Sequence, residues 1–390
     1  MSVPVAALPA QMRIGSTMMV MSDASPQPGR AMGEATRAFH HAGSDAAPRR
    51  LGDLTLSSIG LGTYLGSDDD ETDALYAEAI GRSLDSGVNV IDTAINYRSQ
   101  HSERVIGAVL RERIGTGRLA RGAVFIASKA GYVPFDGRRP RQYAPWLEET
   151  YLKTGIIPRA ELVNGVHCMA PGYLADQIER SRRNLGLDTI DLYYLHNPES
   201  GMEGVDPREF RRRLREAFAA LESAVERGAI GMYGTATWSG YRQVPGESPR
   251  HSLVEMLAIA REVAGEAHHF RAIQLPYNLA YIEAHATATQ ELGDKVVPLL
   301  EAAAASGIYV MTSAPLLQGQ LASRLPDEVR AVLGLASDAQ RAVQFARSTP
   351  GVGTVLVGMK RVAHVAEMAT VAKTPPISAE RIESLFAGNT

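Results

Sequence analysis

Residues 88–97, Val-Asn-Val-Ile-Asp-Thr-Ala-Ile-Asn-Tyr, carry the strongest structural signal in this chain of 390 residues. Val88, Val90 and Ile91 are typical of a short buried strand. Asp92 ends the apolar run, and Tyr97 follows five residues later. Parallel α/β folds build their sites at the carboxyl ends of strands, so an acid in this position indicates a functional site.

Two later apolar runs end in the same way. The run Val-Phe-Ile-Ala-Ser-Lys ends in Lys129, and the run Ile-Asp-Leu-Tyr-Tyr-Leu-His ends in His196. Each run therefore closes with one polar, titratable group. We expect Asp92, Tyr97, Lys129 and His196 to meet at one end of the sheet and to carry out proton chemistry there.

After residue 51, apolar strand-like runs alternate with helical patterns. Strands are expected at 58–63, 88–92, 124–128, 190–195, 230–234, 271–275, 308–312 and 354–357. Helices are expected at 71–85, 102–113, 174–185, 208–227, 252–264, 295–305, 338–347 and 361–371. Strict alternation indicates parallel strands. Eight units predict an α/β fold, the (β/α)8 TIM barrel, in a single domain. A doubly wound open sheet is the alternative, which alternation alone does not exclude.

Three local features complete the expected organisation. Residues 1–50 are rich in Ala, Ser, Pro and Met without periodicity, which predicts a poorly ordered extension before a barrel at 51–390. A short strand at 54–56 is expected to cover one end of the barrel, and Ser102 is expected to cap a helix. Residues 130–171 hold five prolines and no regular pattern, so we interpret them as a long substrate loop after the third strand.

The bulk composition narrows the class of protein. Hydrophobic residues make up 45% of the chain, and the formal net charge is −3, which gives no electrostatic reason to expect nucleic acid or an anionic membrane as partner. The single cysteine, Cys168, excludes an intrachain disulfide and a cysteine-based zinc cluster. No apolar run approaches the ~18–20 residues of a membrane helix, and we expect no signal peptide. We expect a cytoplasmic protein, and the sequence indicates no oligomeric state.

The four strand-end residues form a chemically coherent set. A tyrosine is a poor acid near neutrality, with a reference pKa of about 10. The ammonium of Lys129 would favour the phenolate of Tyr97 and lower its pKa, and Asp92 would hold Lys129 charged and in place. His196 would donate a hydrogen bond to a substrate oxygen or complete a proton path. This arrangement is typical of a general acid facing a polarised carbonyl.

Each residue also has a simpler interpretation when taken alone. A strand-end aspartate such as Asp92 is most often a cap or turn former, and a lone tyrosine such as Tyr97 is more often packed at the surface. Lys129 alone would be a surface ion pair, which usually contributes little. His196 alone would be a satisfied buried histidine. Only their joint placement favours the catalytic interpretation.

The sequence resembles the aldo-keto reductase superfamily over about residues 51–372. The matching segments are Ile-Asp-Thr-Ala-Ile-Asn-Tyr (91–97), His-Ser-Glu-Arg-Val-Ile-Gly (101–107), Ser-Lys (128–129), Asp-Leu-Tyr-Tyr-Leu-His (191–196), Gly-Leu-Gly-Thr (60–63), Gln-Leu-Pro-Tyr-Asn (274–278), Ala-Pro-Leu-Leu-Gln-Gly (314–319) and Val-Gly-Met-Lys (357–360). The Asp-x4-Tyr spacing alone is a weak signal. Eight matches in order are a strong one.

The resemblance implies a (β/α)8 barrel that binds NADP(H) across the carboxyl ends of its strands. It assigns the family's catalytic Asp/Tyr/Lys/His set to Asp92, Tyr97, Lys129 and His196, with Tyr97 as the acid that protonates the carbonyl oxygen. The implied cofactor-binding residues are Gly62, Thr63, Asp92, Thr237, Gln274, Ser313, Leu316, Gly358, Lys360, His364 and Glu367. Lys360 is the implied partner of the 2′-phosphate, which favours NADP over NAD. The substrate is expected to meet Tyr64, Tyr97, His196, Tyr132 and Trp146.

Three positions depart from the family pattern. Ala236 and Thr237 stand where the family usually has Ser-Asn for the nicotinamide carboxamide. Ser313 replaces an aromatic residue that stacks on the nicotinamide, and Met368 replaces an asparagine that contacts adenine. Each change removes a hydrogen bond or a stack worth about 1 kcal/mol. Trp238, just beyond Thr237, is a candidate for restoring an aromatic surface.

Three functions remain open on the sequence alone. The first is an NADP(H)-dependent oxidoreductase that reduces a small-molecule aldehyde or ketone to an alcohol, or runs the reverse reaction. The second is a nucleotide-binding regulatory subunit on the same fold with little or no turnover. The third is a barrel enzyme that uses Lys129 as a Schiff-base amine, which ranks last because Asp92 would keep that amine protonated. No metal is expected.

Overall fold

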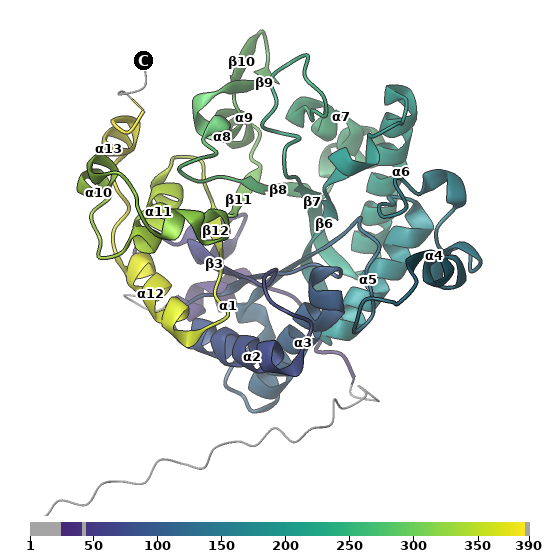
Figure 1. Cartoon of the computed structure of the whole chain (residues 1–390), viewed down its shortest axis with the longest axis horizontal. Coiled ribbons are helices and arrows are strands. Elements are labelled where there is room, and N and C mark those ends of the chain that lie inside the picture. Colours follow the sequence, from purple (N-terminus) through teal and green to yellow (C-terminus); the bar gives the residue numbers. More distant parts are fainter. Residues whose placement is uncertain (1–24, 41–43, 387–390) are drawn as a thin grey trace, which may run out of the picture.

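The computed structural model describes residues 25–40 and 44–386, and its centre is a closed barrel of parallel strands (Figure 1). Around the barrel the strands follow the order β11-β12-β3-β4-β5-β6-β7-β8. Their bounds are β3 (Ile59–Gly62), β4 (Val90–Asp92), β5 (Phe125–Ala130), β6 (Ile190–His196), β7 (Ile230–Ala236), β8 (Phe270–Pro276), β11 (Tyr309–Ser313) and β12 (Thr354–Gly358). The expected (β/α)8 barrel is confirmed, and the open-sheet alternative is wrong.

A helix of the outer layer follows each barrel strand, and Figure 1 shows these helices as a ring around the strands. Their bounds are α2 (Asp70–Asp85), α3 (His101–Gly115), α5 (Pro171–Leu185), α6 (Pro207–Glu226), α7 (Leu253–Ala264), α9 (Leu299–Ala305), α11 (Asp338–Ser348) and α12 (Val362–Lys373). The helix α6 shows how the sequence sets these limits. Asp206 caps its first turn ahead of Pro207, and Gly228 follows it with φ of 73°.

Shorter elements decorate the barrel. The helices are α1 (Gly33–Phe39), α4 (Tyr143–Leu147), α8 (Glu283–Ala286), α10 (Asp327–Leu333) and α13 (Ala379–Glu383). Two antiparallel hairpins pair β1 (Arg49–Leu51) with β2 (Leu54–Leu56), and β9 (Ala288–Leu292) with β10 (Lys295–Pro298). The long segment between β5 and α5 contains α4, a π-helical turn at Glu148–Leu152 and a 3₁₀ turn at Arg159–Glu161. This loop is therefore more regular than its prolines suggest.

The buried apolar residues form two groups, one inside the barrel and one between the barrel and its helices. The inner group contains Leu54 and Leu56 of β2 together with Phe125, Leu192 and Tyr194 from the barrel strands. The hairpin β1–β2 therefore covers the amino end of the strands, as expected for residues 54–56. The opposite, carboxyl end of the strands is called the mouth below.

The segment before the barrel is the first point at which the structure differs from expectation. Residues 25–40 and 44–50 are packed rather than poorly ordered. The amide of Gln27 donates to the Gly186 carbonyl at 2.8 Å, and Asp45 forms an ion pair with Arg347 in which both side chains are buried. Amino-acid composition could not predict that these residues are ordered, because the residues they contact lie far away in the sequence. Residues 1–24 and 41–43, which belong to the same expectation, lie outside the described residues.

Two further expectations are wrong in detail. The helix expected at 295–305 begins only at Leu299, because residues 295–298 form the second strand of a hairpin. Ser102 is not the cap of α3. The helix begins at His101, and the Ser102 hydroxyl instead donates to the Thr63 carbonyl at 2.7 Å. Propensity misled in both places because tertiary contacts outweigh it.

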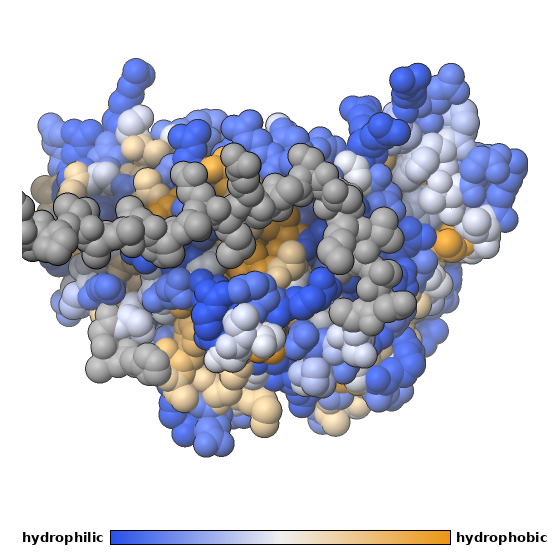
Figure 2. All heavy atoms as spheres, turned by 90° about the horizontal axis from the view of Figure 1, so that it is seen from below, coloured by the Kyte–Doolittle hydropathy of each residue, from blue (hydrophilic) through white to orange (hydrophobic). Residues whose placement is uncertain are grey.

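Figure 2 shows hydrophilic side chains over much of one face, with apolar side chains in separate groups between them. Within the described ranges, each helix is either too short or too polar to span a membrane.

Candidate active site

Three adjacent strands carry the polar residues of the mouth. Asp92 ends β4, Lys129 lies one residue before the end of β5, and His196 ends β6. Tyr97 begins the 3₁₀ turn that follows β4. Because these strands are neighbours and parallel, all four side chains lie at the same end of the barrel. The structure thus brings together the four residues singled out in the sequence, which are called the tetrad below.

The ammonium of Lys129 is the centre of the tetrad. Its Nζ lies 2.5 Å from Asp92 Oδ1, 2.8 Å from the Thr93 carbonyl oxygen and 3.3 Å from the Tyr97 hydroxyl. The second carboxylate oxygen of Asp92 accepts a hydrogen bond of 2.8 Å from Gln274 Nε2. Lys129 is fully buried, so its charge depends on these acceptors.

Burial and charge act in opposite directions on this group of residues. Burial disfavours the ammonium of Lys129, but the Asp92 carboxylate and the Tyr97 phenol outweigh it, so the pKa of Lys129 is raised. Burial raises the pKa of Tyr97, and Lys129 opposes that shift without cancelling it. The expectation that Lys129 lowers this pKa below its ordinary value is therefore wrong. Tyr97 is protonated at neutral pH, and Lys129 favours the phenolate that proton transfer would leave behind.

His196 faces Tyr97 across the mouth, with ring centroids 5.8 Å apart at an interplanar angle of 76°. Burial, together with the nearby charge of Lys129, holds the pKa of His196 well below its usual range, so the ring is neutral. Its Nδ1 is buried without a hydrogen-bond partner among the described residues. A neutral imidazole has one N–H donor and one acceptor nitrogen, so the ring can donate one hydrogen bond at the mouth.

An unusual turn follows Tyr97. Arg98, Ser99 and Gln100 have φ values of 49°, 51° and 73°, three successive left-handed residues that are not glycine. Arg98 is buried and pairs with Asp73 at 2.5 Å. The side chains of the turn reach the Ser67 carbonyl, the Asp68 carboxylate, the Phe135 carbonyl and the Asn184 amide. These contacts hold the strained backbone and fix the position of Tyr97.

The expected substrate residues divide into two groups. Tyr64 is 57% exposed and packs edge-on against Tyr97 with centroids 5.0 Å apart, and Tyr132 packs edge-on against His196 at 5.2 Å. Trp146 instead belongs to an aromatic cluster within the long loop, and no ring contact joins it to the tetrad among the described residues. The rings of this cluster belong to Phe135, Tyr143, Trp146 and Tyr151.

The residues expected around the nicotinamide lie at the carboxyl ends of several strands. Gly62 ends β3, Ser313 ends β11, and Thr237 directly follows β7 next to Ala236. The Thr63 hydroxyl donates to the Asp92 carbonyl at 3.1 Å, and the Thr237 amide donates to the Gln274 carbonyl at 2.8 Å. Leu316 lies after β11, one residue before the 3₁₀ stretch Leu317–Ala322.

The residues expected at the adenosine end lie at and beyond the end of β12. Gly358 ends this strand, and Lys360 and His364 follow it. Among the described residues, no carboxylate pairs with Lys360. Its Nζ lies near Gly66, 3.8 Å from the position that a Cβ atom would occupy on that glycine. The carboxylate of Glu367 accepts a hydrogen bond from Ser337. Met368 is buried in the core and faces away from solvent.

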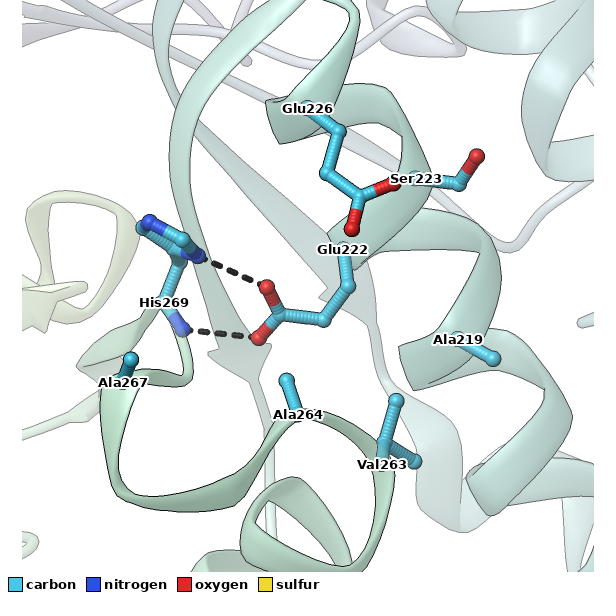
Figure 3. Close-up of a pocket in the computed structure, with 8 residues that line it drawn as sticks. All are labelled: Ala219, Glu222, Ser223, Glu226, Val263, Ala264, Ala267 and His269. Carbon is cyan, nitrogen blue, oxygen red and sulfur yellow. Dashed lines mark hydrogen bonds and ion pairs between the residues drawn. The ribbon is translucent and has the colours of Figure 1, made fainter.

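A hollow between α6 and α7 lies outside this site. Glu222 accepts hydrogen bonds from both the backbone amide and Nδ1 of His269 at 2.7 Å (Figure 3). His269 precedes β8, so the hollow lies at the amino end of the strands, opposite the mouth. His268 contacts Arg271 instead, and within the described chain no cluster of His, Cys, Asp and Glu could hold a metal.

Three contacts at the mouth were not predicted from the sequence. Gln274 was expected to contact a cofactor, yet it binds Asp92. Arg98 anchors the turn after Tyr97, and Glu199 binds the loop that follows β7. Local periodicity cannot reveal such contacts, because Gln274 and Asp92 are 182 positions apart in the sequence.

The fold and the tetrad together define a (β/α)8 barrel protein with its polar centre at the carboxyl end of the strands. The model of the Aldo/keto reductase family matches residues 58–387. The chain therefore belongs to the aldo/keto reductase family, and the resemblance inferred from its motifs is confirmed.

Curated relatives are similar over part of their length. The chain is 27% identical over 189 residues to the NADH-specific methylglyoxal reductase of Escherichia coli K12, which covers 47% of this chain and 49% of the relative. It is 27% identical over 208 residues to human aldo-keto reductase family 1 member C2, covering 51% and 49%. The chain thus spans about half the length of the curated relatives it matches.

Solved structures resemble the chain over most of its length. An aldo-keto reductase from Bacillus halodurans in its holo form has a TM-score of 0.58 at 21% identity, covering 87% of this chain and 96% of that one. An aldo/keto reductase from Klebsiella pneumoniae in complex with NADP and acetate has a TM-score of 0.57 at 20% identity, covering 88% and 95%. At this identity the likeness shows the fold.

Proposed function

We propose that this protein is an NADP(H)-dependent oxidoreductase that reduces an aldehyde or ketone to an alcohol, or catalyses the reverse reaction. One observation carries the proposal: a single buried ammonium, Lys129 Nζ, lies within hydrogen-bond distance of both the Asp92 carboxylate and the Tyr97 hydroxyl. Family membership and the nucleotide-bound neighbours support it. The partner is a small molecule.

Each residue of the tetrad has a distinct role in this proposal. Tyr97 donates its phenolic proton to the carbonyl oxygen. Lys129 stabilises the phenolate that results, and Asp92 keeps the ammonium charged and in place. His196 is neutral and donates its one ring N–H to the same oxygen, which orients the carbonyl.

The residues of the mouth fit a nicotinamide dinucleotide. When bound, the reduced cofactor supplies the hydride that the carbonyl carbon receives. Lys360 would hold the 2′-phosphate, since its ammonium has no carboxylate partner in the described chain and is therefore available to an anion. Gly62, Thr63, Thr237 and Ser313 would surround the nicotinamide end, and Leu316, Gly358, His364 and Glu367 the remainder of the dinucleotide.

A second candidate is a nucleotide-binding regulatory subunit with little turnover. The observation that favours it is the hydrogen bond from Gln274 Nε2 to Asp92, because an amide already engaged there is a poorer partner for the cofactor carboxamide. The absence of an aromatic side chain at Ser313 acts in the same direction. Both features would loosen the nicotinamide and leave the rest of the dinucleotide bound.

A paired assay separates the two candidates. NADPH and NADH are each mixed with the protein, and binding is followed by fluorescence while consumption is followed with a panel of aldehydes and ketones. We expect binding of NADPH and consumption by the native protein. Tyr97→Phe is expected to lose about 10²–10⁴-fold in kcat with unchanged NADPH binding.

The matched control is Tyr143→Phe, which removes a hydroxyl bonded to the Gly165 carbonyl in the long loop. Its kcat is expected to stay near that of the native protein. Unchanged turnover in Tyr97→Phe would refute its role as the acid. Binding of NADPH without consumption across the whole panel would favour the regulatory subunit.

A further inference from the structure

A buried carboxylate connects two loops at the mouth. Glu199 lies in the 3₁₀ turn Pro198–Gly201, three residues after His196, and is only 7% exposed. Its Oε1 accepts the backbone amide of Trp238 at 2.6 Å and that of Ser239 at 3.1 Å. One side chain after β6 thus captures two successive N–H groups of the loop after β7.

His251 lies next to the other carboxylate oxygen of Glu199. Its Nε2 lies 3.5 Å from Glu199 Oε2, and its side chain is almost fully buried. The imidazole stacks on Phe210 with an interplanar angle of 12°. A Cβ on Gly240 would lie 2.3 Å from the ring, so glycine is required for this close approach. Burial alone would raise the pKa of Glu199, but the nearby His251 and the captured amides outweigh it and lower the pKa, so the carboxylate is ionised. Its Oε1 is held by the two amides, whereas Oε2 makes no hydrogen bond among the described residues.

Trp238 is exposed yet fixed on several sides. The residue is 44% exposed, while its amide donates to Glu199 and its carbonyl accepts a hydrogen bond from Arg242 Nε at 3.1 Å. The indole meets the edge of Tyr281, with centroids 6.3 Å apart. The Arg242 guanidinium lies 4.2 Å above the Tyr281 ring and pairs with Glu283. A large apolar side chain held this firmly in solvent is typical of a ligand-binding surface.

The opposite side of the mouth carries a second exposed ring. Tyr64 follows β3 and Trp238 follows β7, and three strands separate β3 from β7 in either direction around the barrel. Leu65, beside Tyr64, is 40% exposed. The tetrad lies along the strands between these two apolar walls, and the charges of Lys129 and Asp92 are paired below the surface. The mouth therefore suits an uncharged substrate with a flat apolar part.

We propose that Trp238 binds the planar apolar part of the carbonyl substrate and that Glu199 is the residue that positions Trp238, so that the enzyme prefers aromatic over short aliphatic carbonyls. The assignment rests on the oxidoreductase function proposed above. Glu199 acts through the loop and touches no reacting atom. An aromatic contact is worth enough free energy to change affinity about tenfold.

The first test reads the position of Trp238 without any reaction. The chain has two tryptophans, so Trp146→Phe leaves Trp238 as the sole reporter. In that background, the time-resolved fluorescence anisotropy of Trp238 is measured in the protein that retains Glu199 and in its Glu199→Ala and Glu199→Gln variants. We expect a larger fast component in Glu199→Ala only, because glutamine keeps an oxygen that accepts the two amides. Glu203→Gln, an exposed carboxylate in the same loop, is the matched control.

The second test compares 2-naphthaldehyde with propanal, with NADPH present. Trp238→Ala and Glu199→Ala are expected to lose about tenfold in kcat/KM for 2-naphthaldehyde, mainly through KM, and at most about twofold for propanal. Glu199→Gln is expected to recover most of the loss. Equal losses on both aldehydes, or unchanged anisotropy in Glu199→Ala, would overturn the proposal.

Binding separates this proposal from the proposed function. If the native protein turns over neither aldehyde, the oxidoreductase assignment fails, but quenching of Trp238 fluorescence by 2-naphthaldehyde still measures affinity. Quenching that weakens about tenfold in Glu199→Ala then supports the positioning role. Absence of quenching, or equal affinity in both proteins, overturns it.

Discussion

Both ends of the barrel bury ionic groups, but the hydrogen bonding around these groups differs between the two ends. At the amino end, Asp191 accepts the amides of Ala31 and Ile126 and pairs with Arg121 at 2.9 Å. At the mouth, Lys129 and Asp92 pair at 2.5 Å, yet the neighbouring Nδ1 of His196 has no partner in the described chain.

The second amino-end pair is more completely bonded than the first, in which Arg121 Nε has no hydrogen-bond partner among the described residues. Arg347 contacts Asp45, the Ser58 hydroxyl and the carbonyls of Ala372 and Thr374. A buried ion pair whose groups are all bonded joins distant segments and has little left to offer a ligand. The mouth retains a phenol and an imidazole with spare capacity, while all three N–H groups of Lys129 have acceptors. We infer that the amino end serves folding and the mouth serves chemistry.

The largest effect is expected from removing the ammonium at the mouth. Lys129→Met keeps the apolar stem and deletes the charge that favours the Tyr97 phenolate. We expect kcat to fall about 10³-fold, measured with NADPH and an aldehyde. The matched variant at the amino end, Arg121→Met, is expected to keep its kcat per folded molecule. A Lys129→Met variant that retains a tenth of native turnover would contradict this division.

The next effect concerns stability at the amino end. Asp191→Ala leaves the charge of Arg121 and the amide of Ala31 buried without their acceptor. We expect the free energy of unfolding to fall by about 3–5 kcal/mol, measured by urea unfolding, with little change in KM. Asp85→Ala, which removes a more exposed partner of Arg113, should cost only about 1 kcal/mol or less. Similar losses in the two variants would show that the buried pair has no special structural role.

A smaller effect is expected at the rim, where Lys360 has no carboxylate partner within residues 25–40 and 44–386, in contrast to Arg347. Lys360→Met removes the cation proposed to hold the 2′-phosphate. The KM for NADPH is expected to rise about tenfold, while the KM for NADH changes little. Both constants are measured with a single aldehyde. An equal change for the two cofactors would assign Lys360 to another role and remove the basis for preferring NADP(H).

The smallest effect is a pH dependence at the mouth. The pKa of His196 lies well below its ordinary value of 6.5, so the unfolded chain binds this proton first as the pH falls. Its contribution to stability is complete above pH 6.5 and declines below it. Between pH 6.5 and 5.5 the loss from this group is about 1 kcal/mol, and His196→Phe should lack it. Urea unfolding at both pH values measures the difference, and identical slopes for the two proteins would contradict it.

The sequence predicted the barrel and the tetrad because both leave local signals. The alternation of strands and helices predicts the fold, and Asp92, Lys129 and His196 each lie at the end of an apolar run. The hairpin β9–β10 was missed because residues 295–298 adjoin an alanine-rich helical pattern. The turn after Tyr97 was missed because no local rule predicts three left-handed residues without glycine.

Contacts between distant segments could not be predicted in the same way. The capture of the Trp238 amide by Glu199 depends on the side-by-side placement of β6 and β7. The direction of the pKa shift of Tyr97 could not be predicted either, because burial raises this pKa more than Lys129 lowers it. Periodicity indicates which face of an element is buried, but not how deeply a polar group lies beneath a loop.

The left-handed turn after Tyr97 has a consequence for anyone who would graft this chemistry onto another scaffold. Residues 92–100 would not keep their conformation if they were transferred alone. Their backbone is held by donors and acceptors from the loop before α2, from the long loop and from α5. A recipient barrel that copied Asp92 and Tyr97 without these supports would relax the turn and misplace the hydroxyl. The unit to transplant is the turn together with its three supporting segments.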